Sequence, residues 1–350
     1  MIFKPDIFSN NIPNWHLISD QDYTYFEKIL NFIPKKNISN LSKAFYSGAF
    51  EINSSNYKFE SPDGKFILLK KWPIDNSYQK IEKIQRLINW LHKKKIPVPY
   101  SGFFSNKSHV LLFDGFLWSF SLFISGNYYS GSTNEFESVA KISGKLTNVL
   151  FDLPSELMPE LGPSHLSEDD DFIMNKMLEE RVSWVKHFGY DNANLISEHW
   201  NYISDTWKFL NKNKFNLGPI LPCHIDMHPH NLIANNGKIC AILDFDSCKQ
   251  YFLGCSLAYN ALKQCRQFLS QNNQIKSYKK SRNIYLKNLV SEISLNEVSE
   301  YDFLNLSKIE IMRRLCLIFK FNLIDKNTQW NHIIQIQISH LYESDELFKN

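Results

Sequence analysis

Residues 221–247, "LPCHIDMHPHNLIANNGKICAILDFDS", combine two short apolar runs, a turn and polar residues at both ends. The apolar runs are 232–234 and 239–243, and the Asn236-Gly237 pair between them is a strong signal for a tight hairpin turn. A hairpin brings the residues before its first strand beside those after its second strand. Any fold of this chain must therefore place "HIDMHPHN" close to "DFDS".

The rest of the chain divides into a strand-rich first part and a helical second part. Residues 43–72 and 108–124 carry aromatic and β-branched runs with the turn signals Asp63-Gly64 and Asp114-Gly115, which predict strands. Between these regions, the apolar residues of 77–95 recur at helical spacing. Further helices are expected over 135–150, 170–187, 193–212, 256–270 and 308–324.

This order of elements predicts an α+β protein in two lobes. The N-lobe would span residues 1–123 as an antiparallel sheet with one helix. The C-lobe would span 124–350, mostly helical, with a polar hairpin at 222–247. A chain of 350 residues, 43% of them hydrophobic, is long and apolar enough for packed cores at this scale.

Charge and local composition narrow the range of partners. A net charge of +3 gives no reason to expect nucleic acid. No segment approaches the roughly 18 uncharged apolar residues of a spanning helix, and the N-terminus lacks the features of a signal peptide. The six cysteines include no C-x-x-C pair, which favours reduced thiols. We expect a cytoplasmic protein that binds neither nucleic acid nor membranes.

The stretch "HIDMHPHN", residues 224–231, allows two interpretations. His224, Asp226, His228 and His230 alternate as metal ligands could along one face of a strand, which would suit a metallohydrolase. Pro229 argues against such a strand because it has no backbone donor, and the other eight histidines form no second cluster. The same residues also have the His-x-Asp-x-x-x-x-Asn spacing of a kinase catalytic loop.

Phosphoryl transfer makes a further demand that the sequence meets. It needs an acid to orient the acceptor hydroxyl, and oxygen ligands for magnesium on the nucleotide phosphates. Asn231 follows Asp226 by five positions, and Asp244 ends the second apolar run. The hairpin would bring Asn231 and Asp244 together. This combination favours a phosphotransferase over a metallohydrolase.

The run "HIDMHPHNLI…AILDFD" resembles the catalytic segment of the aminoglycoside phosphotransferase and choline kinase superfamily. These are small-molecule kinases with a protein-kinase-like fold. The family pattern is His-Gly-Asp-x-x-x-x-Asn, and here Ile225 replaces the glycine. Asp246 stands where protein kinases have the glycine of Asp-Phe-Gly, which favours the small-molecule branch.

The resemblance implies a role for each polar residue of this segment. Asp226 would be the catalytic base, and His224 would brace the loop. Asn231 and Asp244 would bind magnesium, with Asp246 as a further acid linked to the metal. The implied cofactors are ATP and Mg2+.

The resemblance extends into the N-terminal half. The segment "GKFILLKKWP" offers Lys70 as the contact for the α- and β-phosphates, and "YSGAFEINSSNY" with Gly48 would cover the phosphates. In "WSFSLFISG", backbone groups of Phe123 to Ser125 would meet the adenine.

Two departures from the family pattern stand out. The helix position expected to hold a glutamate partner for Lys70 holds Ile84, with Glu82 nearby. Further on, Ser256-Leu257-Ala258 replaces a common Asp-Leu-Ala.

The expected activity is transfer of the ATP γ-phosphoryl group to a hydroxyl of a small metabolite, such as an amino alcohol, a sugar or an amino acid. The missing glutamate keeps a second interpretation open, a catalytically inactive pseudokinase that binds a nucleotide or a partner. A protein kinase ranks lower because the chain has no Ala-Pro-Glu signature. The sequence does not indicate an oligomeric state.

Four consecutive acids, Glu168 to Asp171, precede a helical pattern and allow two explanations. They could cap the helix, with Ser167 as the first residue of the cap, since acids suit the N-terminal end of the helix dipole. Alternatively, they could attract a cationic amino-alcohol or amino-sugar acceptor.

Asparagine and aspartate oxygens suit magnesium held together with a nucleotide rather than a tightly bound transition metal. We therefore expect purified protein to carry no stoichiometric zinc or iron by elemental analysis. Magnesium should raise the melting temperature only when ATP is also present. Stoichiometric zinc that is lost in His228→Ala would instead support the metallohydrolase.

Overall fold

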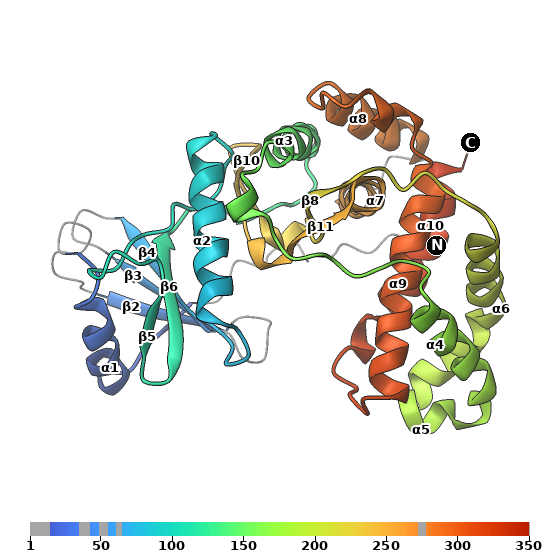
Figure 1. Ribbon diagram of the computed structural model, residues 1–350, viewed down its shortest axis with the longest axis horizontal. Helices are drawn as coiled ribbons and strands as arrows, with labels where there is room; N and C mark the ends of the chain where they lie inside the picture. The colour runs from blue at the N-terminus through green and yellow to red at the C-terminus, as the bar shows by residue number, and fades with distance from the viewer. Residues whose placement is uncertain (1–14, 35–42, 49–54, 61–64, 272–277, 350) are drawn as a thin grey trace. The chain divides into compact units, whose positions relative to one another are not determined.

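The structure is a computed structural model that describes residues 15–34, 43–48, 55–60, 65–271 and 278–349 (Figure 1). The chain forms two compact units. The unit named here the sheet unit comprises the described residues of Asp6–Pro159 together with Asp226–Cys248. The helical unit comprises those of Glu160–Ile225 and Lys249–Asn350. Residues 124–159 thus pack with the sheet unit, and a lobe boundary after residue 123 stays a prediction.

The sheet unit contains a six-stranded sheet in which each strand is antiparallel to its neighbours, in the order β1-β2-β3-β4-β6-β5. Its strands are β1 (His16–Leu17), β2 (Lys43–Gly48), β3 (Ser55–Glu60), β4 (Phe66–Lys71), β5 (Leu111–Phe113) and β6 (Phe116–Leu122). The prediction of strands in both N-terminal regions is confirmed. The Asp63-Gly64 turn lies outside the described residues.

The turn between β5 and β6 shows why this sequence forms a hairpin. Asp114 and Gly115 have φ angles of 53° and 75°, so both lie in the left-handed region that a type I′ turn requires. Helix α1 (Asp20–Leu30) buries Phe26 and Ile29 against Trp118 of β6 and its neighbours. Burial of such large side chains removes the apolar face of the sheet from water.

Helix α2 (Tyr78–Lys93) also belongs to the sheet unit. The oxygen of the Ser77 side chain accepts a hydrogen bond from the Lys80 amide, which satisfies one of the unpaired donors at the start of the helix. The buried residue Ile81 packs with Trp72, directly after β4, and with Val110. The helix predicted over 77–95 is therefore confirmed within two residues at each end.

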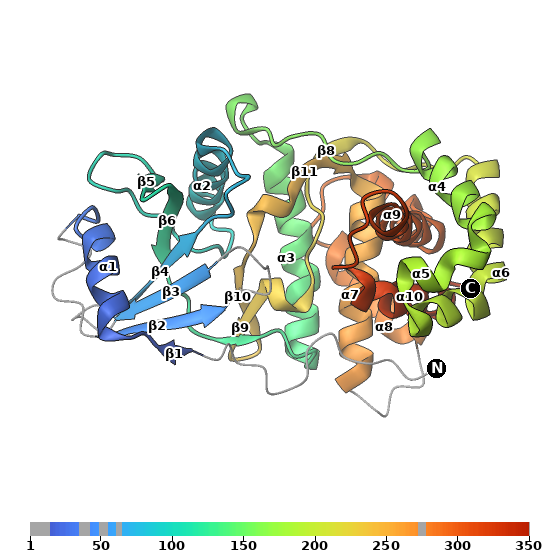
Figure 2. The ribbon, with the colours of Figure 1, turned by 90° about the horizontal axis from the view of Figure 1, so that it is seen from below.

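The predicted polar hairpin is present as β9 (Leu232–Asn235) and β10 (Lys238–Ile242). A short third strand, β7 (Asn127–Tyr128), pairs with β9 and was not expected. Helix α3 (Thr133–Phe151) lies beside the hairpin (Figure 2), and its Ser138 hydroxyl accepts a hydrogen bond from the Ile239 amide at 3.0 Å. The segment before β7 is close to the hairpin, since a Cβ at Gly126 would lie 2.6 Å from the Ala234 carbonyl oxygen.

The helical unit is built from seven α-helices and one pair of short strands within the part of the chain described. The helices are α4 (Glu168–Glu179), α5 (Trp184–Phe188), α6 (Tyr190–Lys212), α7 (Leu253–Gln271), α8 (Tyr278–Val290), α9 (Phe303–Leu323) and α10 (Ile334–Phe348), and the paired strands are β8 (Ile220–His224) and β11 (Cys248–Phe252). Helix α7 packs against α9, and both are buried along most of their length. In the described part of the chain, no helix is both long and apolar enough to cross a membrane.

The helix expected over 170–187 is interrupted, which is a correction to the sequence interpretation. Helix α4 ends at Glu179, and α5 begins at Trp184 after a single 3₁₀ turn. The buried Trp184 indole donates to the Met177 carbonyl oxygen at 2.9 Å, and so it satisfies an acceptor near the end of α4. Tertiary burial of this tryptophan therefore overrides the local helical pattern.

All six cysteine thiols are free, and five of them are buried. Burial raises the pKa of Cys223 to about 12, and it also raises the pKa of the partly exposed Cys240. Because the thiolate is the reactive form, we expect Cys240 to react first with a disulfide reagent under native conditions. The five buried thiols should react on the timescale of unfolding. Equally fast native labelling of Cys223, measured by peptide mass spectrometry, would contradict this packing.

Candidate active site

The loop between β8 and β9 is held in one conformation by its own hydrogen bonds. The Asp226 carbonyl oxygen accepts from the His228 amide and from the Asn231 side-chain Nδ2, both at 2.9 Å. The Asn231 amide in turn donates to the His228 carbonyl oxygen at 2.9 Å. Because Nδ2 of Asn231 donates within the loop, the Oδ1 atom is the side-chain atom that can accept a donor or bind a cation.

The hairpin brings Asn231 and Asp244 to the same end, as its spacing predicts. Ile242 pairs with Leu232 at the end of the β9–β10 ladder. One step further, the Leu243 amide donates to the Asn231 carbonyl oxygen at 2.8 Å. Asn231 accepts this bond, and Asp244 directly follows its donor, so the two residues lie at the same end of the hairpin. Both side chains carry hard oxygen atoms, the type of ligand that magnesium prefers.

Asp244 has an unusual backbone conformation. Its φ and ψ angles are 66° and 51°, in the left-handed region, which costs an ordinary L-residue about 1–2 kcal/mol. Aspartate and asparagine tolerate this region better than most residues, and such strain concentrates at functional sites. The 3₁₀ turn Phe245–Ser247 follows directly and contains Asp246, which is half-buried.

Lys70 and Lys71 are adjacent on β4 but have different surroundings. The Lys70 Nζ lies 3.7 Å from the Asp244 Oδ1 and 4.1 Å from the centre of the Trp72 ring. The Lys71 Nζ lies 3.3 Å from the centre of the Phe116 ring, and burial lowers its pKa. Since successive side chains of a strand point to opposite faces, Lys70 alone of this pair is directed toward the end of the hairpin.

The α2 glutamate nearest to the expected position has another role. The Glu82 Oε2 accepts from the Ser108 hydroxyl at 2.8 Å and from the His109 amide at 3.1 Å. It therefore holds the loop that precedes β5. Ile84, at the position where the family has the glutamate, packs against the cluster around Trp72. The acid beside Lys70 thus comes from the hairpin instead of from α2.

The residues expected around the nucleotide base, Phe123 to Ser125, directly follow β6. The Phe123 amide donates to the Phe66 carbonyl oxygen at 2.9 Å, so this backbone donor is already engaged. Any adenine contact from this segment would therefore have to use the Phe123 carbonyl oxygen or the backbone groups of residues 124 and 125. Gly48 is the last residue of β2 and pairs with Ser55, while the loop 49–54 lies outside the described residues.

The histidines of the loop have local partners rather than a shared centre. The His228 Nε2 lies 3.5 Å from the Asp226 Oδ2, and its Nδ1 accepts from the His230 amide at 3.2 Å. The His230 ring packs edge to face against Tyr128 of β7. His224 is buried at the end of β8. The contacts of His228 and His230 explain their presence, since both side chains help to hold the conformation of the loop.

The acidic run before α4 forms a helix cap. The Ser167 hydroxyl accepts from the Asp170 amide at 3.2 Å, and the Asp170 carboxylate accepts from the Ser167 amide at 3.1 Å, which completes a capping box. The Asp171 carboxylate accepts from the Trp207 indole at 3.1 Å and from the Asn211 side chain. Two of the four acids are therefore committed to the helical unit, and the capping explanation is favoured.

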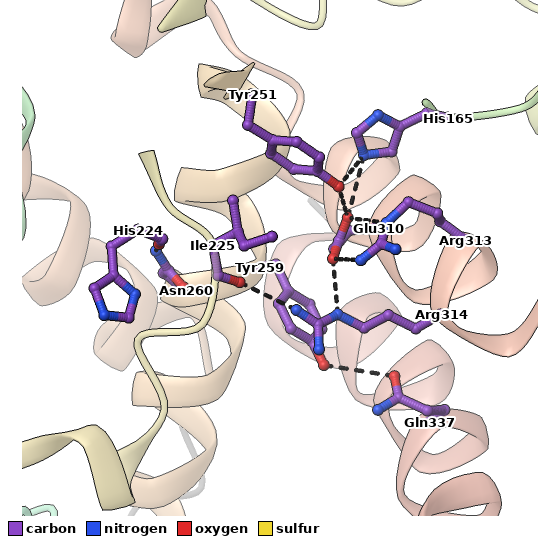
Figure 3. A network of polar contacts seen from close by, with 10 residues as sticks. All are labelled: His165, His224, Ile225, Tyr251, Tyr259, Asn260, Glu310, Arg313, Arg314 and Gln337. Carbon is purple, nitrogen blue, oxygen red and sulfur yellow. Dashed lines mark hydrogen bonds and ion pairs between the residues drawn. The ribbon is translucent and has the colours of Figure 1, made fainter. Parts of the chain in front are cut away.

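A buried polar network around Glu310 of α9, which sequence reasoning missed, extends within the helical unit to the backbone of Ile225 (Figure 3). Glu310 is 1% exposed and accepts from Arg313 Nη2 and Arg314 Nε, both at 2.7 Å. It also contacts His165 Nε2 at 3.1 Å and the Tyr251 hydroxyl. The available sequence signal was the placement of three charges at 310, 313 and 314 within the otherwise apolar run "IEIMRRLCLIF".

The ionisation of Glu310 follows from these partners. Burial alone would raise the pKa of Glu310, but the charges of Arg313 and Arg314 and the hydrogen bond with His165 hold it well below its usual range. A buried carboxylate is tolerated when it is paired and hydrogen-bonded in this way. The same negative charge, together with burial, raises the pKa of Tyr251 well above its ordinary value.

Residues 49–262 match the sequence model of the group described as the phosphotransferase enzyme family. No curated protein sequence matches the chain. Among solved structures, spectinomycin phosphotransferase APH(9)-Ia, in complex with ADP and spectinomycin, aligns over 92% of this chain and 93% of its own, with a TM-score of 0.62 and 14% identity.

Two further structures are similar at comparable coverage. The amicoumacin kinase hAmiN, in complex with AMP-PNP and Ca2+, aligns over 95% of this chain and 96% of its own, with a TM-score of 0.60 and 11% identity. Choline kinase from Cryptosporidium parvum Iowa II aligns over 93% and 95%, with a TM-score of 0.56 and 14% identity. The fold is therefore kinase-like, with an antiparallel sheet in the N-terminal region and helices in the C-terminal part.

The conformation of Asp244 allows its charge to be tested apart from its backbone. Asp244→Asn should fold with little loss of stability because asparagine also tolerates the left-handed region, whereas Asp244→Ala should lose about 1 kcal/mol more. Both variants should lose most of the magnesium-dependent rise in melting temperature that ATP produces. Asp114→Asn is the matched control, since Asp114 also has a left-handed φ angle of 53° but lies in the β5–β6 turn. A full magnesium-dependent rise in Asp244→Asn would exclude this acid as a ligand.

Proposed function

We propose, from the premise that this chain belongs to the phosphotransferase enzyme family, that it transfers the γ-phosphoryl group of ATP to a hydroxyl of a small metabolite. One observation carries the proposal. The Lys70 Nζ lies 3.7 Å from the Asp244 Oδ1 at the end of the hairpin that also presents Asn231. A cation for phosphates and oxygen ligands for a metal therefore meet within one compact unit, next to the loop that carries Asp226.

The residues of the hairpin fit a magnesium–nucleotide complex by their chemistry. The Asn231 Oδ1 and the Asp244 carboxylate are hard oxygen donors, and Asp246 follows in the next turn as a further acid. When bound there, magnesium would neutralise charge on the phosphates. Lys70 would contact the α- and β-phosphates, with its ammonium group held over Trp72.

Asp226 would act on the acceptor. Its backbone is fixed by the hydrogen bonds of the loop, so its carboxylate can align the acceptor hydroxyl and receive its proton. His224 would brace the loop from the end of β8. Gly48 would belong to the segment that covers the phosphates, and the backbone of Phe123 to Ser125 would border the adenine.

The proposed chemical class of the acceptor rests on structurally similar proteins and not on the shape of a binding pocket. Neighbours named as choline kinase, aminopropanol kinase and spectinomycin phosphotransferase support a hydroxyl-bearing small molecule, and amino alcohols, sugars and amino acids are the classes to test. Use of ATP together with free thiols supports a cytoplasmic location.

An inactive nucleotide-binding protein is the second candidate, and one observation favours it. The carboxylate of Glu82, the acid of α2, accepts hydrogen bonds from Ser108 and His109. The glutamate that the family pairs with the strand lysine therefore has no counterpart at Ile84. In this interpretation, ATP would still stabilise the protein but no ADP would form with any acceptor.

Release of ADP across a panel of amino alcohols, sugars and amino acids tests the activity. With an accepted substrate, Asp226→Ala should lower turnover by about 10²- to 10⁴-fold, the usual contribution of a general base, while ATP still raises the melting temperature. Asp325→Asn, which changes an exposed acid of the helical unit outside any proposed site, serves as the control and should keep wild-type turnover. More than a tenth of wild-type turnover in Asp226→Ala would remove it from the role of base.

A further inference from the structure

We propose that Arg314 is a positioning residue for Asp226, an inference that rests on the proposed phosphotransferase function. The Arg314 Nη2 donates a hydrogen bond to the Ile225 carbonyl oxygen at 3.1 Å (Figure 3). Ile225 directly precedes Asp226, although Arg314 lies 89 residues away in sequence. The α9 arginine therefore holds the backbone at the base of the catalytic loop.

The planarity of the peptide group turns this bond into a constraint on Asp226. The carbonyl of Ile225 and the N and Cα atoms of Asp226 share one peptide plane, whose atoms cannot rotate independently. When Arg314 fixes the direction of the Ile225 oxygen, it also fixes the position of the Asp226 Cα, the atom from which the side chain starts. Displacement of a reacting group by about 1 Å can cost roughly 10²-fold in rate.

The guanidinium of Arg314 is itself held by its own contacts. Its Nε donates to the Glu310 Oε1 at 2.7 Å, its Nη2 donates to the Ile225 oxygen, and its planar group lies 4.4 Å from the centre of the Tyr259 ring. A guanidinium donates to a carboxylate from Nε and to a carbonyl from Nη2 in one fixed orientation, whereas the compact, rotatable ammonium of a lysine has no such separated and fixed donors. The buried charge of Glu310 thus determines where Arg314 points.

A second helix acts on the preceding peptide. The Asn260 Nδ2, on α7, donates to the His224 carbonyl oxygen at 3.3 Å. Asn260 is 3% exposed, so this bond is shielded from water. Two consecutive carbonyl oxygens, those of His224 and Ile225, are therefore held by side chains from α7 and α9 (Figure 3).

Arg313 is a matched control that the chain itself supplies. It is adjacent to Arg314, donates to the same Glu310 at 2.7 Å, and is the more buried, with a side chain 9% exposed against 21%. Among the hydrogen bonds of the described residues, those of Arg313 go to Glu310 and not to the loop. If both arginines had a purely structural role, substitution of Arg313 should lower kcat more. If Arg314 positions Asp226, substitution of Arg314 should lower kcat more.

The test compares Arg314→Met, Arg314→Lys and Arg313→Met in the full chain. We expect Arg314→Met to lower kcat about 10- to 100-fold with the ATP KM within about twofold, since phosphate contacts are unaffected. Arg314→Lys should recover much of the melting temperature that Arg314→Met loses but not kcat, because a lysine keeps the charge beside Glu310 and lacks the fixed fork of donors that holds the Ile225 oxygen. Arg313→Met should lower the melting temperature at least as much and keep kcat within about threefold of wild type.

Amide hydrogen exchange provides a readout that needs no acceptor. The peptide that contains residues 222–231 should exchange faster in Arg314→Met than in wild type or Arg313→Met. Loss of kcat in proportion to lost melting temperature in both arginine variants, or unchanged kcat and exchange in Arg314→Met, would overturn the inference. The absence of ADP release from wild-type protein with every acceptor would instead contradict the proposed function, while exchange would still report whether Arg314 holds the loop.

Discussion

The antiparallel pairing of β9 with β10 is the interaction on which the candidate site depends. The hydrogen bond from the Leu243 amide to the Asn231 carbonyl oxygen extends this ladder by one step, and the oxygen-bearing side chains of Asn231 and Asp244 flank it. The same hairpin carries Asp244 to Lys70 of β4. Without this pairing, three residues that are remote in sequence would have no reason to meet.

Much of this hairpin could be predicted because its determinants are local. Asn236 and Gly237 adopt φ angles of 50° and 73°, as a type I′ turn requires, and few other dipeptides accept that geometry. The β5–β6 turn and helix α2 were predictable for the same reason. Turn chemistry and helical periodicity are properties of neighbouring residues, and their signal does not depend on the rest of the fold.

Other parts of the site depend on tertiary contacts and could not be derived from the sequence. The two-residue strand β7 exists because Asn127 and Tyr128 find β9 as a partner, and its sequence has no strand signal of its own. The sequence alone does not distinguish solvated from paired charges at Glu310 and Arg314, and in the structure both lie within a buried network. A residue's neighbours across the fold decide whether a charge is solvated or paired.

The acidic run before α4 shows the opposite outcome, in which the plainer local explanation sufficed. Ser167 and Asp170 bond to each other's amides at the first turn of the helix, as a capping box does. Asp171 adds a bond to the Trp207 indole. A run of four acids in this sequence is therefore explained first by the start of a helix and only then by a ligand.

The proximity of Lys70 to Asp244 has a consequence for the ligand-free protein. Their side chains are 22% and 29% exposed, so each charge keeps part of its hydration and the pair contributes on the order of 0–1 kcal/mol. Under the proposed function, a phosphate would pair with Lys70 and its cation with Asp244, and these two pairings would replace the weak one between the side chains. In the ligand-free protein, each of these two charges is therefore the counter-ion of the other, and under the proposed function ligand entry would replace one set of counter-ions with another.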